Sequence, residues 1–572
     1  MRRPLAIAFF AIRVPLAIAL PPLFWVIDAT RRASVTPLGR DQGIFQYVAW
    51  AIRHGAVDYR DIRDVNGPLT HWVHLVFLAL GGADEHRFRV LDLMVTGASF
   101  AAAGACLPRV FAAARPRGSE RVAWALATWA AESGQYLLYS FWDSAQRESF
   151  FDWFMLPGLA LQLVAQRPRE PRRHVLLGVV GALSVTPWFG KPTYALVTAA
   201  QALALAVDGR LDSPRSRRRA FAAFGAGIAC GALVQLGLLA VVGDVPAYLR
   251  IQLIDVPAMY RFIWPRTAEE ILSTPFFATY SALAVAGGVT LGALVAAGEM
   301  PASVTAVALV PLAALAGVLI QAKGFPYHFH PVSAGVVLQW LVLAAWLEDR
   351  ARVARRRLAA VRLVPLGVAA ALGLHIAAGL MDAPALRDPW LLWAARSVEA
   401  RGSSAYVEHF ARVDFFPTEL REAAAYLRDH TASGDTVQVY GMDPYILFLA
   451  GRMSASPYVY AYDLNADAAL AGGTAAVPST EQASRIRAMR EEHELDLMAR
   501  SSAQPPGAFV FVDASPLLTE ADAWDDFEEH CAATAEWVRD HYREVARFGH
   551  DHVWLRSDLA AEPTPQPSRE DP

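Results

Sequence analysis

Long apolar segments recur along the first two thirds of this 572-residue chain and limit what it can fold into. A helix of about 20 apolar residues crosses the hydrocarbon core of a bilayer. Eleven segments approach that length, and 54% of all residues are hydrophobic. The segments lie near residues 5–27, 87–107, 121–141, 150–166, 175–190, 192–208, 220–243, 276–297, 302–322, 331–347 and 363–381. The sequence therefore predicts a mainly α-helical polytopic membrane protein with about 11 transmembrane helices.

Arginine clusters indicate how these spans are oriented. The clusters lie at residues 2–3, 109–121, 167–173, 210–219 and 350–362. Basic residues beside membrane helices concentrate on the cytoplasmic side. All clusters share that side if residues 69–80 do not cross, and this short segment with two histidines is better suited to the outer interface. We therefore expect a multi-pass protein of the inner (plasma) membrane with a cytoplasmic N-terminus. For residues 244–275 we expect either another interfacial helix or a plain loop.

The chain becomes polar after Met381, where helical and strand patterns begin to alternate. Expected helices lie at residues 417–430, 443–451, 480–499 and 524–541. Expected strands lie at residues 436–441, 458–462, 508–512, 545–548 and 552–555, the last two as a hairpin. Alternation of this kind predicts a small α/β domain. The predicted division is a transmembrane domain at 1–382 with an external loop at 28–86, a linker at 383–416, an extracytoplasmic α/β domain at 417–558 and a disordered tail at 559–572.

The first external loop carries the outward-facing acids nearest the N-terminus. Asp41 follows the first span directly and is suited either to act as a general base or to cap a helix that starts at Gln42. The remaining residues of interest form one run, Tyr59, Asp61, Asp64 and Pro68. Asp61 and Asp64 are candidates for orienting an acceptor. The alternative is that they pair with the neighbouring arginines in a surface turn.

Positive charge at the outer ends of later spans predicts a phosphate site. The chain has two lysines among its 52 lysines and arginines, and both, Lys191 and Lys323, stand at such ends. Lysine offers phosphate a compact point charge, although it also anchors helix ends by snorkelling. Further outward-facing candidates for binding the phosphate are Arg147, Arg261, Tyr327, His328 and His330. The acids Asp143 and Glu148 lie in the same outward-facing loops. Local hydrogen bonding is the alternative role of the two histidines.

Taken together, this topology, the early external Asp41, the run from Tyr59 to Pro68 and the lysines at outer span ends resemble the GT-C superfamily of membrane glycosyltransferases. Its bacterial branch with the aminoarabinose and protein O-mannosyl transferases is the most similar. The resemblance implies an inverting transfer of a sugar from a polyprenyl-phosphate donor to a glycan, lipid or protein acceptor of the cell envelope. It also implies that Asp41 is the general base on the outer face. The residues implied in orienting the acceptor or the loop are Tyr59, Asp61, Asp64, Asp143 and Glu148.

The chemistry of this transfer needs few groups. The leaving phosphate is already a weak base, so one carboxylate suffices and no second carboxylate is needed as general acid. Some relatives hold a divalent cation with an acid beside the catalytic Asp, but here the neighbour is Gln42. We therefore expect no metal and no other cofactor, with Asp143 and Glu148 as the candidate ligands if a cation is used. The three cysteines suggest no disulfide framework.

Two other functions fit a polytopic membrane protein. A transporter or flippase of lipid-linked sugars predicts internal repeats and charges in broken helices near the bilayer midplane. The acids of this chain cluster instead at the outer ends of the spans. A non-catalytic scaffold would use the α/β domain to bind an envelope partner. A net charge of −3 gives no indication of nucleic-acid binding.

Overall fold

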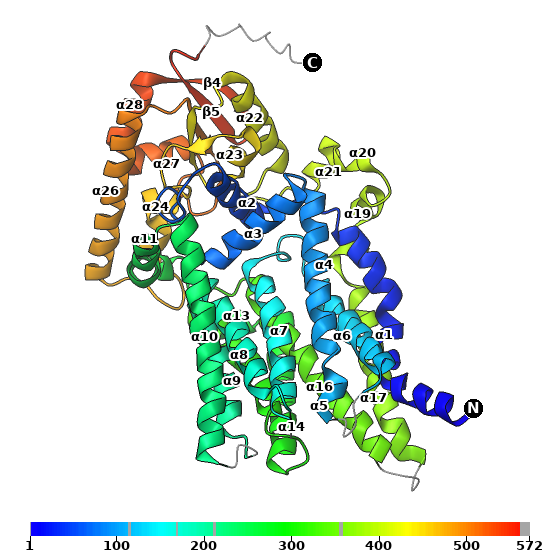
Figure 1. The fold of residues 1–572 in the computed structure, drawn as a ribbon. Coiled ribbons are helices and arrows are strands. Elements are labelled where there is room, and N and C mark those ends of the chain that lie inside the picture. Colours follow the sequence, from blue (N-terminus) through cyan, green and yellow to red (C-terminus); the bar gives the residue numbers. More distant parts are fainter. Residues whose placement is uncertain (1, 112–115, 168–169, 210–212, 354–358, 561–572) are drawn as a thin grey trace. The chain divides into compact units, whose positions relative to one another are not determined.

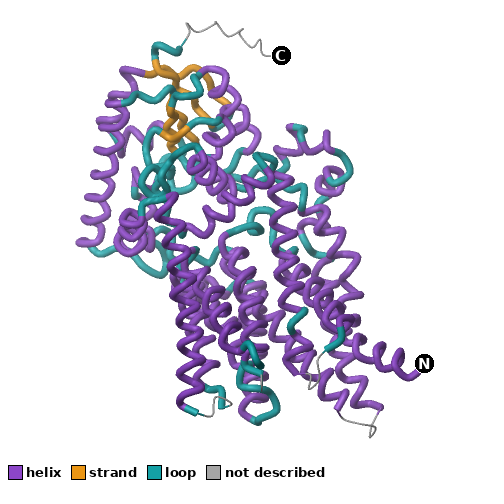
Figure 2. The backbone as a smooth tube through the Cα atoms, viewed as in Figure 1, coloured by secondary structure: helices purple, strands orange, loops and turns teal. Residues whose placement is uncertain are grey.

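The computed structural model describes residues 2–111, 116–167, 170–209, 213–353 and 359–560. The protein is mainly helical, with one five-stranded sheet near its C-terminus (Figures 1 and 2). It divides into two compact units, each built from separate stretches of the chain. Unit 1 consists of Met1–Leu38, Asn66–Leu238 and Arg266–Arg401, and unit 2 of Gly39–Val65, Leu239–Pro265 and Gly402–Pro572. The middle of the first external loop, residues 39–65, thus groups with C-terminal residues, whereas the predicted division placed the whole loop with residues 1–382.

Helices in unit 1 coincide with the apolar segments of the sequence. They are α1 (Arg2–Ala33), α4 (Glu85–Gly104), α5 (Leu107–Phe111), α6 (Gly118–Tyr136), α7 (Arg147–Ala165), α8 (Arg173–Val185), α9 (Ala195–Ala206), α14 (Pro275–Ala296), α15 (Val304–Gln321), α16 (His330–Val353) and α17 (Ala359–Leu380), together with most of α10 (Pro214–Val242). Within the described residues, seven helical segments are long and apolar enough to cross a membrane. The chain is therefore a multi-pass membrane protein, and the count of 11 spans stays a prediction.

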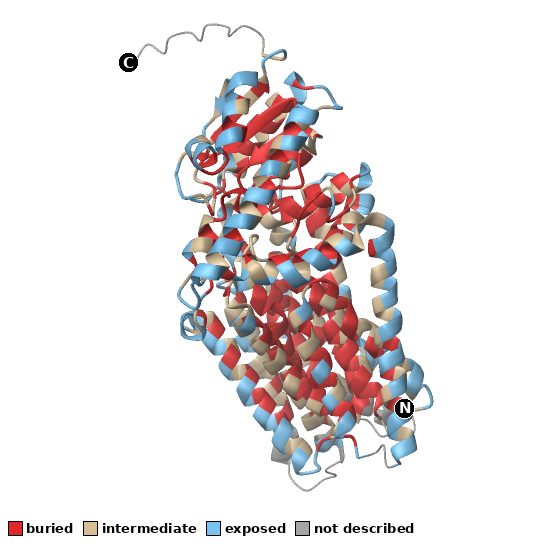
Figure 3. Ribbon diagram, turned by 90° about the vertical axis from the view of Figure 1, so that its left-hand side faces the viewer, coloured by how far each residue is buried: buried red, intermediate tan, exposed pale blue. Residues whose placement is uncertain are grey.

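The core of unit 1 is formed by large side chains from several helices, among them Phe100, Trp124 and Phe151. Small residues let helices approach closely, since a Cβ atom on Gly373 of α17 would lie 2.6 Å from the carbonyl oxygen of Ile18 in α1. On the outside, α10 and α14 expose apolar side chains such as Leu233 and Val289. Figure 3 shows buried positions inside the helical bundle and exposed ones on its outer surface, as expected for helices in contact with lipid.

Two segments, residues 69–80 and 244–275, were expected to lie in the membrane interface and not to cross the membrane. Helix α3 (Pro68–Gly81) has 14 residues, too few to cross a bilayer, and its place in the interface stays a prediction. Residues 244–275 form a series of short helices rather than one interfacial helix. These are α11 (Val245–Arg250), the π-helix η3 (Ile251–Asp255), α12 (Val256–Ala258), the 3-10 helix η4 (Tyr260–Phe262) and α13 (Ala268–Leu272). From the arginine clusters, Arg115, Arg169, Arg210 and Arg355 to Arg357 lie outside the described residues, as does the expected tail from residue 561.

The sheet of unit 2 has the strand order β2-β1-β3-β5-β4. The strands are β1 (Thr436–Tyr440), β2 (Met453–Ser454), β3 (Ala508–Val512), β4 (Tyr542–Phe548) and β5 (Asp551–Arg556). Strand β1 pairs parallel with β2 and β3, and β5 pairs antiparallel with β3 and β4. The predicted strands at 436–441 and 508–512 and the C-terminal hairpin are therefore confirmed.

Most helices of unit 2 precede or alternate with these strands along the chain. They are α2 (Arg40–Arg53), α22 (Pro417–His430), α23 (Tyr445–Ala450), α24 (Tyr462–Asn465), α25 (Asp467–Ala471), α26 (Thr480–Ala503), α27 (Ala523–His530) and α28 (Ala532–His541). The predicted helix at 417–430 matches α22. The predicted helix at 524–541 is two helices, because the backbone at Cys531 leaves the helical region (φ −127°, ψ 47°). The linker contains the short helices α18 (Pro384–Arg387), α19 (Pro389–Ala394), α20 (Val398–Arg401) and α21 (Ser404–Glu408).

The predicted strand at 458–462 is wrong. Tyr458 and Tyr460 lie in irregular chain, and Tyr462 begins α24. Strand β2 takes the position beside β1 that this segment would need. Every residue from Tyr458 to Tyr462 is buried, so the alternation of tyrosine with small apolar residues does not separate an inner from an outer face. The period of two in the sequence was therefore misleading.

Candidate active-site residues

Asp41 lies in the first turn of α2. This helix begins at Arg40, with Gly39 as its N-cap, and the side-chain oxygen of Gln42 accepts the Gly39 N–H at 2.9 Å. The expectation that Asp41 caps a helix starting at Gln42 is therefore wrong. A carboxylate within the first turn is favoured by the positive end of the helix dipole. Asp41 is half-buried, so it keeps access to a ligand.

Helix α2 is fixed to C-terminal residues of the same unit. Buried Arg40 donates from Nε to Asp443 at 3.0 Å and forms an ion pair with Asp414 at 3.2 Å. Gly43 packs so closely on Tyr445 that a Cβ atom would lie 2.8 Å from the ring. The sequence could not reveal these contacts, because about 400 residues separate the partners. They set the position of Asp41 next to the C-terminal part of unit 2.

The run from Tyr59 to Asp64 divides into surface and buried parts. Tyr59 has a positive φ of 65° and packs against Tyr248 with ring centroids 5.0 Å apart. Asp61 pairs with exposed Arg60 at 2.8 Å and accepts the Val57 N–H, which is the surface-turn alternative. Asp64, by contrast, is fully buried.

Arg63 joins this loop to two distant acids. It forms ion pairs with Asp255 at 2.6 Å and with Asp463 at 2.9 Å, and all three side chains are buried. Burial opposes the charge of Arg63, but Asp463 and Asp255 outweigh it and raise the pKa of the guanidinium. The partners of Arg63 are therefore Asp255 and Asp463, from two other segments of unit 2, and not a neighbouring Asp of the loop.

Two tyrosines that the sequence analysis did not single out lie beside the loop acids. Burial and then the carboxylate of Asp64 raise the pKa of Tyr460 well above its usual value, and Asp41 adds to this effect. Burial, Asp463 and Asp64 do the same for the pKa of Tyr462. The two rings are stacked, with centroids 5.2 Å apart. We call Asp41, Asp64, Tyr460 and Tyr462 the tyrosine–acid cluster; the repeated tyrosines of SPYVYAY were its signal in the sequence.

A second group lies in unit 1, at the start of α7. One oxygen of buried Glu148 accepts from Arg147 at 3.1 Å and also pairs with Lys191, which is half-buried. Lys191 in turn donates to Nε2 of His328 at 3.0 Å. We call Arg147, Glu148, Lys191 and His328 the cation cluster. Asn66, which the sequence analysis also missed, accepts a hydrogen bond from Arg147.

The structure does not place His330 and Asp143 in this group. His330 stacks on Tyr139 with centroids 3.8 Å apart, and its Nε2 lies 2.9 Å from the carbonyl oxygen of Asp143. The side chain of Asp143 accepts a hydrogen bond from the Ser140 hydroxyl at 2.7 Å. These contacts correspond to the local hydrogen-bonding alternative for His330.

The remaining predicted phosphate ligands lie in different surroundings. Lys323 is buried, which lowers its pKa to about 7. Tyr327 packs edge-on against His328, with centroids 4.8 Å apart. Arg261 belongs to unit 2, where its guanidinium lies over the ring of Phe262 at 4.5 Å. These residues therefore stay individual candidates rather than members of the cation cluster.

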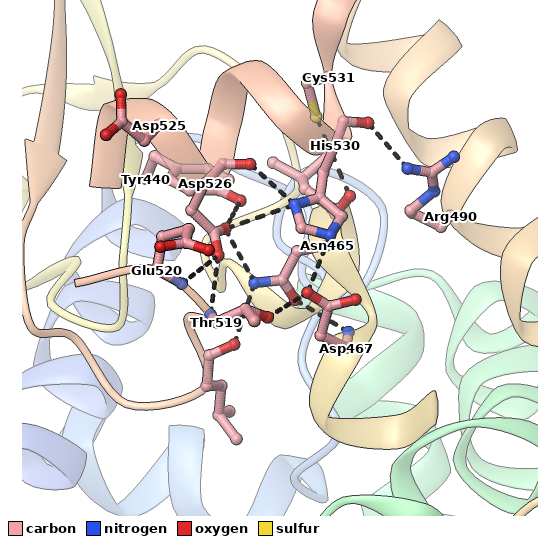
Figure 4. A network of polar contacts seen from close by, with 12 residues as sticks. Tyr440, Asn465, Asp467, Arg490, Thr519, Glu520, Asp525, Asp526, His530 and Cys531 are labelled. Carbon is pink, nitrogen blue, oxygen red and sulfur yellow. Dashed lines mark hydrogen bonds and ion pairs between the residues drawn. The ribbon is translucent and has the colours of Figure 1, made fainter. Parts of the chain in front are cut away.

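One group of side chains in the described part of unit 2 has the composition of a metal site. Oxygen and nitrogen atoms of Asp467, Asp526 and His530 lie within 4.8 Å of one another (Figure 4). Asp526, however, already accepts from the Tyr440 hydroxyl and from the backbone N–H of Thr519. Burial opposes protonation of His530, but hydrogen bonds to Asp467 and to the Asp526 carbonyl raise its pKa to about 9. A protonated imidazole does not bind metal, so the arrangement fits an internal ion pair better.

The chain matches no protein-family model and no curated protein. Solved structures with similar folds include ArnT from Cupriavidus metallidurans bound to undecaprenyl phosphate (15% identity, TM-score 0.49), with 96% of this chain and 98% of that chain covered. Another is the archaeal oligosaccharyltransferase AglB from Archaeoglobus fulgidus in complex with an inhibitory peptide and a dolichol-phosphate (12% identity, TM-score 0.46), with 98% and 74% covered. At such identities the roles of individual residues depend on this chain's own side chains.

Proposed function

We propose that this protein is an integral membrane glycosyltransferase that moves a sugar from a polyprenyl-phosphate donor to a hydroxyl group of a cell-envelope acceptor. The observation that supports it most is the setting of Asp41. This carboxylate is half-buried in the first turn of a helix that buried ion pairs hold in place. A fixed carboxylate beside polar side chains is what a general base requires.

Asp41 acts on the acceptor. It takes the proton of the acceptor hydroxyl while the oxygen attacks the anomeric carbon of the donor sugar. The bond from that carbon to the phosphate oxygen breaks, and polyprenyl phosphate leaves with the electron pair. Attack from the side opposite the phosphate inverts the anomeric centre. Among the other loop residues, Asp64 and Tyr59 orient the acceptor-binding loop, and Asp61 belongs to the surface turn.

The cation cluster binds the donor phosphate. Lys191 and Arg147 supply positive charge where negative charge develops on the leaving group, and such preorganised charge stabilises a transition state. Glu148 positions both cations through its shared oxygen. His328 contributes as a member of this cluster, and Lys323 and Tyr327 are secondary candidates for the same phosphate. The reaction as proposed uses the cations of the chain itself, and neither a metal ion nor another cofactor has a role in it.

The proposed membrane arrangement follows from the positive-inside rule. About 11 spans with a cytoplasmic N-terminus would place the first external loop and residues 417–558 on the extracytoplasmic side of the inner membrane. The acceptor is then a component of the envelope. A donor lipid reaches the outer leaflet on the same side.

Replacement of Asp41 tests this function. Purified protein in liposomes would be incubated with radiolabelled polyprenyl-phosphate sugars and an envelope extract, and transfer of label would be measured. A general base contributes about 10²–10⁴-fold to a rate, so we expect Asp41→Asn to lose at least about 100-fold of the transfer rate. The matched control is Asp61→Asn, which alters a carboxylate of the same loop that pairs only at the surface. Unchanged transfer by Asp41→Asn would rule out the proposed base, and lipid translocation without transfer would favour a flippase.

A further inference from the structure

A groove of about 550 Å³ runs along the outside of unit 1 between α1 and α4. Helix α6 packs against both of these helices and contributes Trp129 to the lining. The volume lies in the range of sites that hold small molecules, about 300–1,000 Å³. No lining residue belongs to the cation cluster or to the tyrosine–acid cluster, so the groove is built from different residues than the proposed site of sugar transfer.

The part of the groove along α4 is apolar. Val90, Met94 and Gly97 are spaced by four and three residues, so they share one face of the helix, and Ala98 extends it. Met94 is 65% exposed. Gly97 leaves the floor hollow, since a Cβ atom there would lie 2.9 Å from Nε1 of Trp129. This face rises about 12 Å along the helix axis, and a hydrocarbon chain suits it.

The end of the groove beside the C-terminus of α1 is polar and carries positive charge. Arg31 is the one charged residue among those that line the groove, and its side chain is 46% exposed. Its partner Asp28, at 3.0 Å, is shared with Arg32 at 2.6 Å, so two guanidinium groups face a single carboxylate. Thr30 and Ser34 bring hydroxyl groups to the same end. Arg31 therefore retains N–H donors and charge for an anion.

This order of polar and apolar surface matches the layers of a bilayer. Arg31 comes shortly after the apolar segment at 5–27, where headgroups are expected, whereas the apolar face lies within the segment at 87–107. A phospholipid presents a phosphate group and then an acyl chain in the same order. Polyprenyl phosphate has a similar chemistry, but the proposed transfer already assigns its phosphate to the cation cluster.

We propose that the groove binds one anionic phospholipid of the surrounding bilayer, with the phosphate group at Arg31 and an acyl chain along α4. The planar guanidinium donates parallel hydrogen bonds to phosphate oxygens. A zwitterionic headgroup would bring a second cation beside Arg31, whereas an anionic headgroup does not. The lipid fills the space between α1 and α4 and takes no part in the transfer of sugar.

Native mass spectrometry of the full-length protein in detergent tests this assignment. The protein would be titrated with phosphatidylglycerol and with phosphatidylcholine of identical acyl chains, so that the two ligands differ only in the headgroup. Arg31→Met removes the guanidinium and leaves Asp28 paired with Arg32, and Ala98→Trp fills the apolar part of the groove. The matched control is Arg387→Met, which removes an exposed guanidinium of the same unit that forms a surface ion pair and does not line the groove.

We expect the unaltered protein to bind the first phosphatidylglycerol about fivefold more tightly than the first phosphatidylcholine, as one arginine contributes at an anionic lipid. The preference should vanish in Arg31→Met, both lipids should bind more weakly to Ala98→Trp, and Arg387→Met should behave like the unaltered protein. Equal affinities for the two lipids in the unaltered protein, or a preference that survives Arg31→Met, would overturn the inference. Displacement of phosphatidylglycerol by an equal concentration of polyprenyl phosphate would also overturn it and would assign the groove to the donor.

Discussion

The cation cluster of unit 1 and the tyrosine–acid cluster of unit 2 are both largely buried, yet they use polar groups in opposite ways. In the cation cluster, opposite charges form direct ion pairs, because one oxygen of Glu148 contacts both Arg147 and Lys191. In the tyrosine–acid cluster, acids lie beside buried phenols, and Asp64 raises the pKa of both Tyr460 and Tyr462. The first composition suits the binding of an anion, whereas the second carries an excess of negative charge. Under the proposed function, the donor phosphate and the acceptor hydroxyl are therefore handled by groups of opposite charge.

Removal of the positive charge of Lys191 should have the largest effect on the rate of sugar transfer. Lys191→Met takes away a fixed cation from the proposed phosphate site, and loss of one such group costs about 10²–10³-fold in rate. We expect the rate of sugar transfer to fall by that factor, measured with radiolabelled polyprenyl-phosphate sugar. The double variant Lys191→Met with Glu148→Gln serves as the control for a stranded carboxylate. If the double variant recovers full transfer, Lys191 neutralises Glu148 and does not bind the donor.

Replacement of Arg63 should show that a buried charge of unit 2 stabilises the fold without contributing to donor binding. Arg63→Met leaves Asp255 and Asp463 buried without their shared cation, and breaking a buried ion pair on one side costs about 3–5 kcal/mol. We expect lower thermal stability of unit 2 in detergent but unchanged donor binding by the intact protein at low temperature. Arg60→Met, which removes an exposed charge of the same turn, should leave the melting temperature unchanged. Equal melting temperatures of the two variants would contradict a structural role for Arg63.

A smaller effect should appear as a pH dependence of stability. The pKa of His530 is raised to about 9 from a usual value of 6.5, so protonation stabilises the folded state. This contribution is full below about pH 6.5 and is lost as the pH rises through about 9. With solvent screening we expect about 1 kcal/mol, measured by unfolding between pH 6 and 10. His530→Gln should remove this component, whereas the exposed His541→Gln should keep it; an identical pH profile for wild type and His530→Gln would contradict the ion pair.

Much of the fold could be predicted from the sequence because local patterns determine it. Apolar length identified every long helix of unit 1, and the polar–apolar pattern identified α22, β1, β3 and the C-terminal hairpin. The segment at 458–462 failed because alternating tyrosines imitate a strand wherever every residue is buried. Local sequence also could not show that Cys531 divides a helix.

The site was predictable in part for the same reason. Asp41, Lys191 and Glu148 were recognisable from their positions at the ends of apolar segments. The partners of Arg40 and Arg63 were not, because Asp443 and Asp463 are about 400 residues away and no periodicity links them. Tyr460 and Tyr462 were missed because Asp64, the loop acid that acts on both, is about 400 residues away in the sequence.

The dependence of residues 39–65 on residues beyond 402 has a consequence for biosynthesis. Arg40 and Arg63 leave the ribosome long before Asp443 and Asp463, and about 400 residues at roughly 5–20 residues per second amount to a delay of about 20–80 s. During that interval residues 39–65 lack their C-terminal partners, although Asp255 is already present. The buried ion pair that holds the helix of Asp41 therefore forms only after Asp443 has been synthesised.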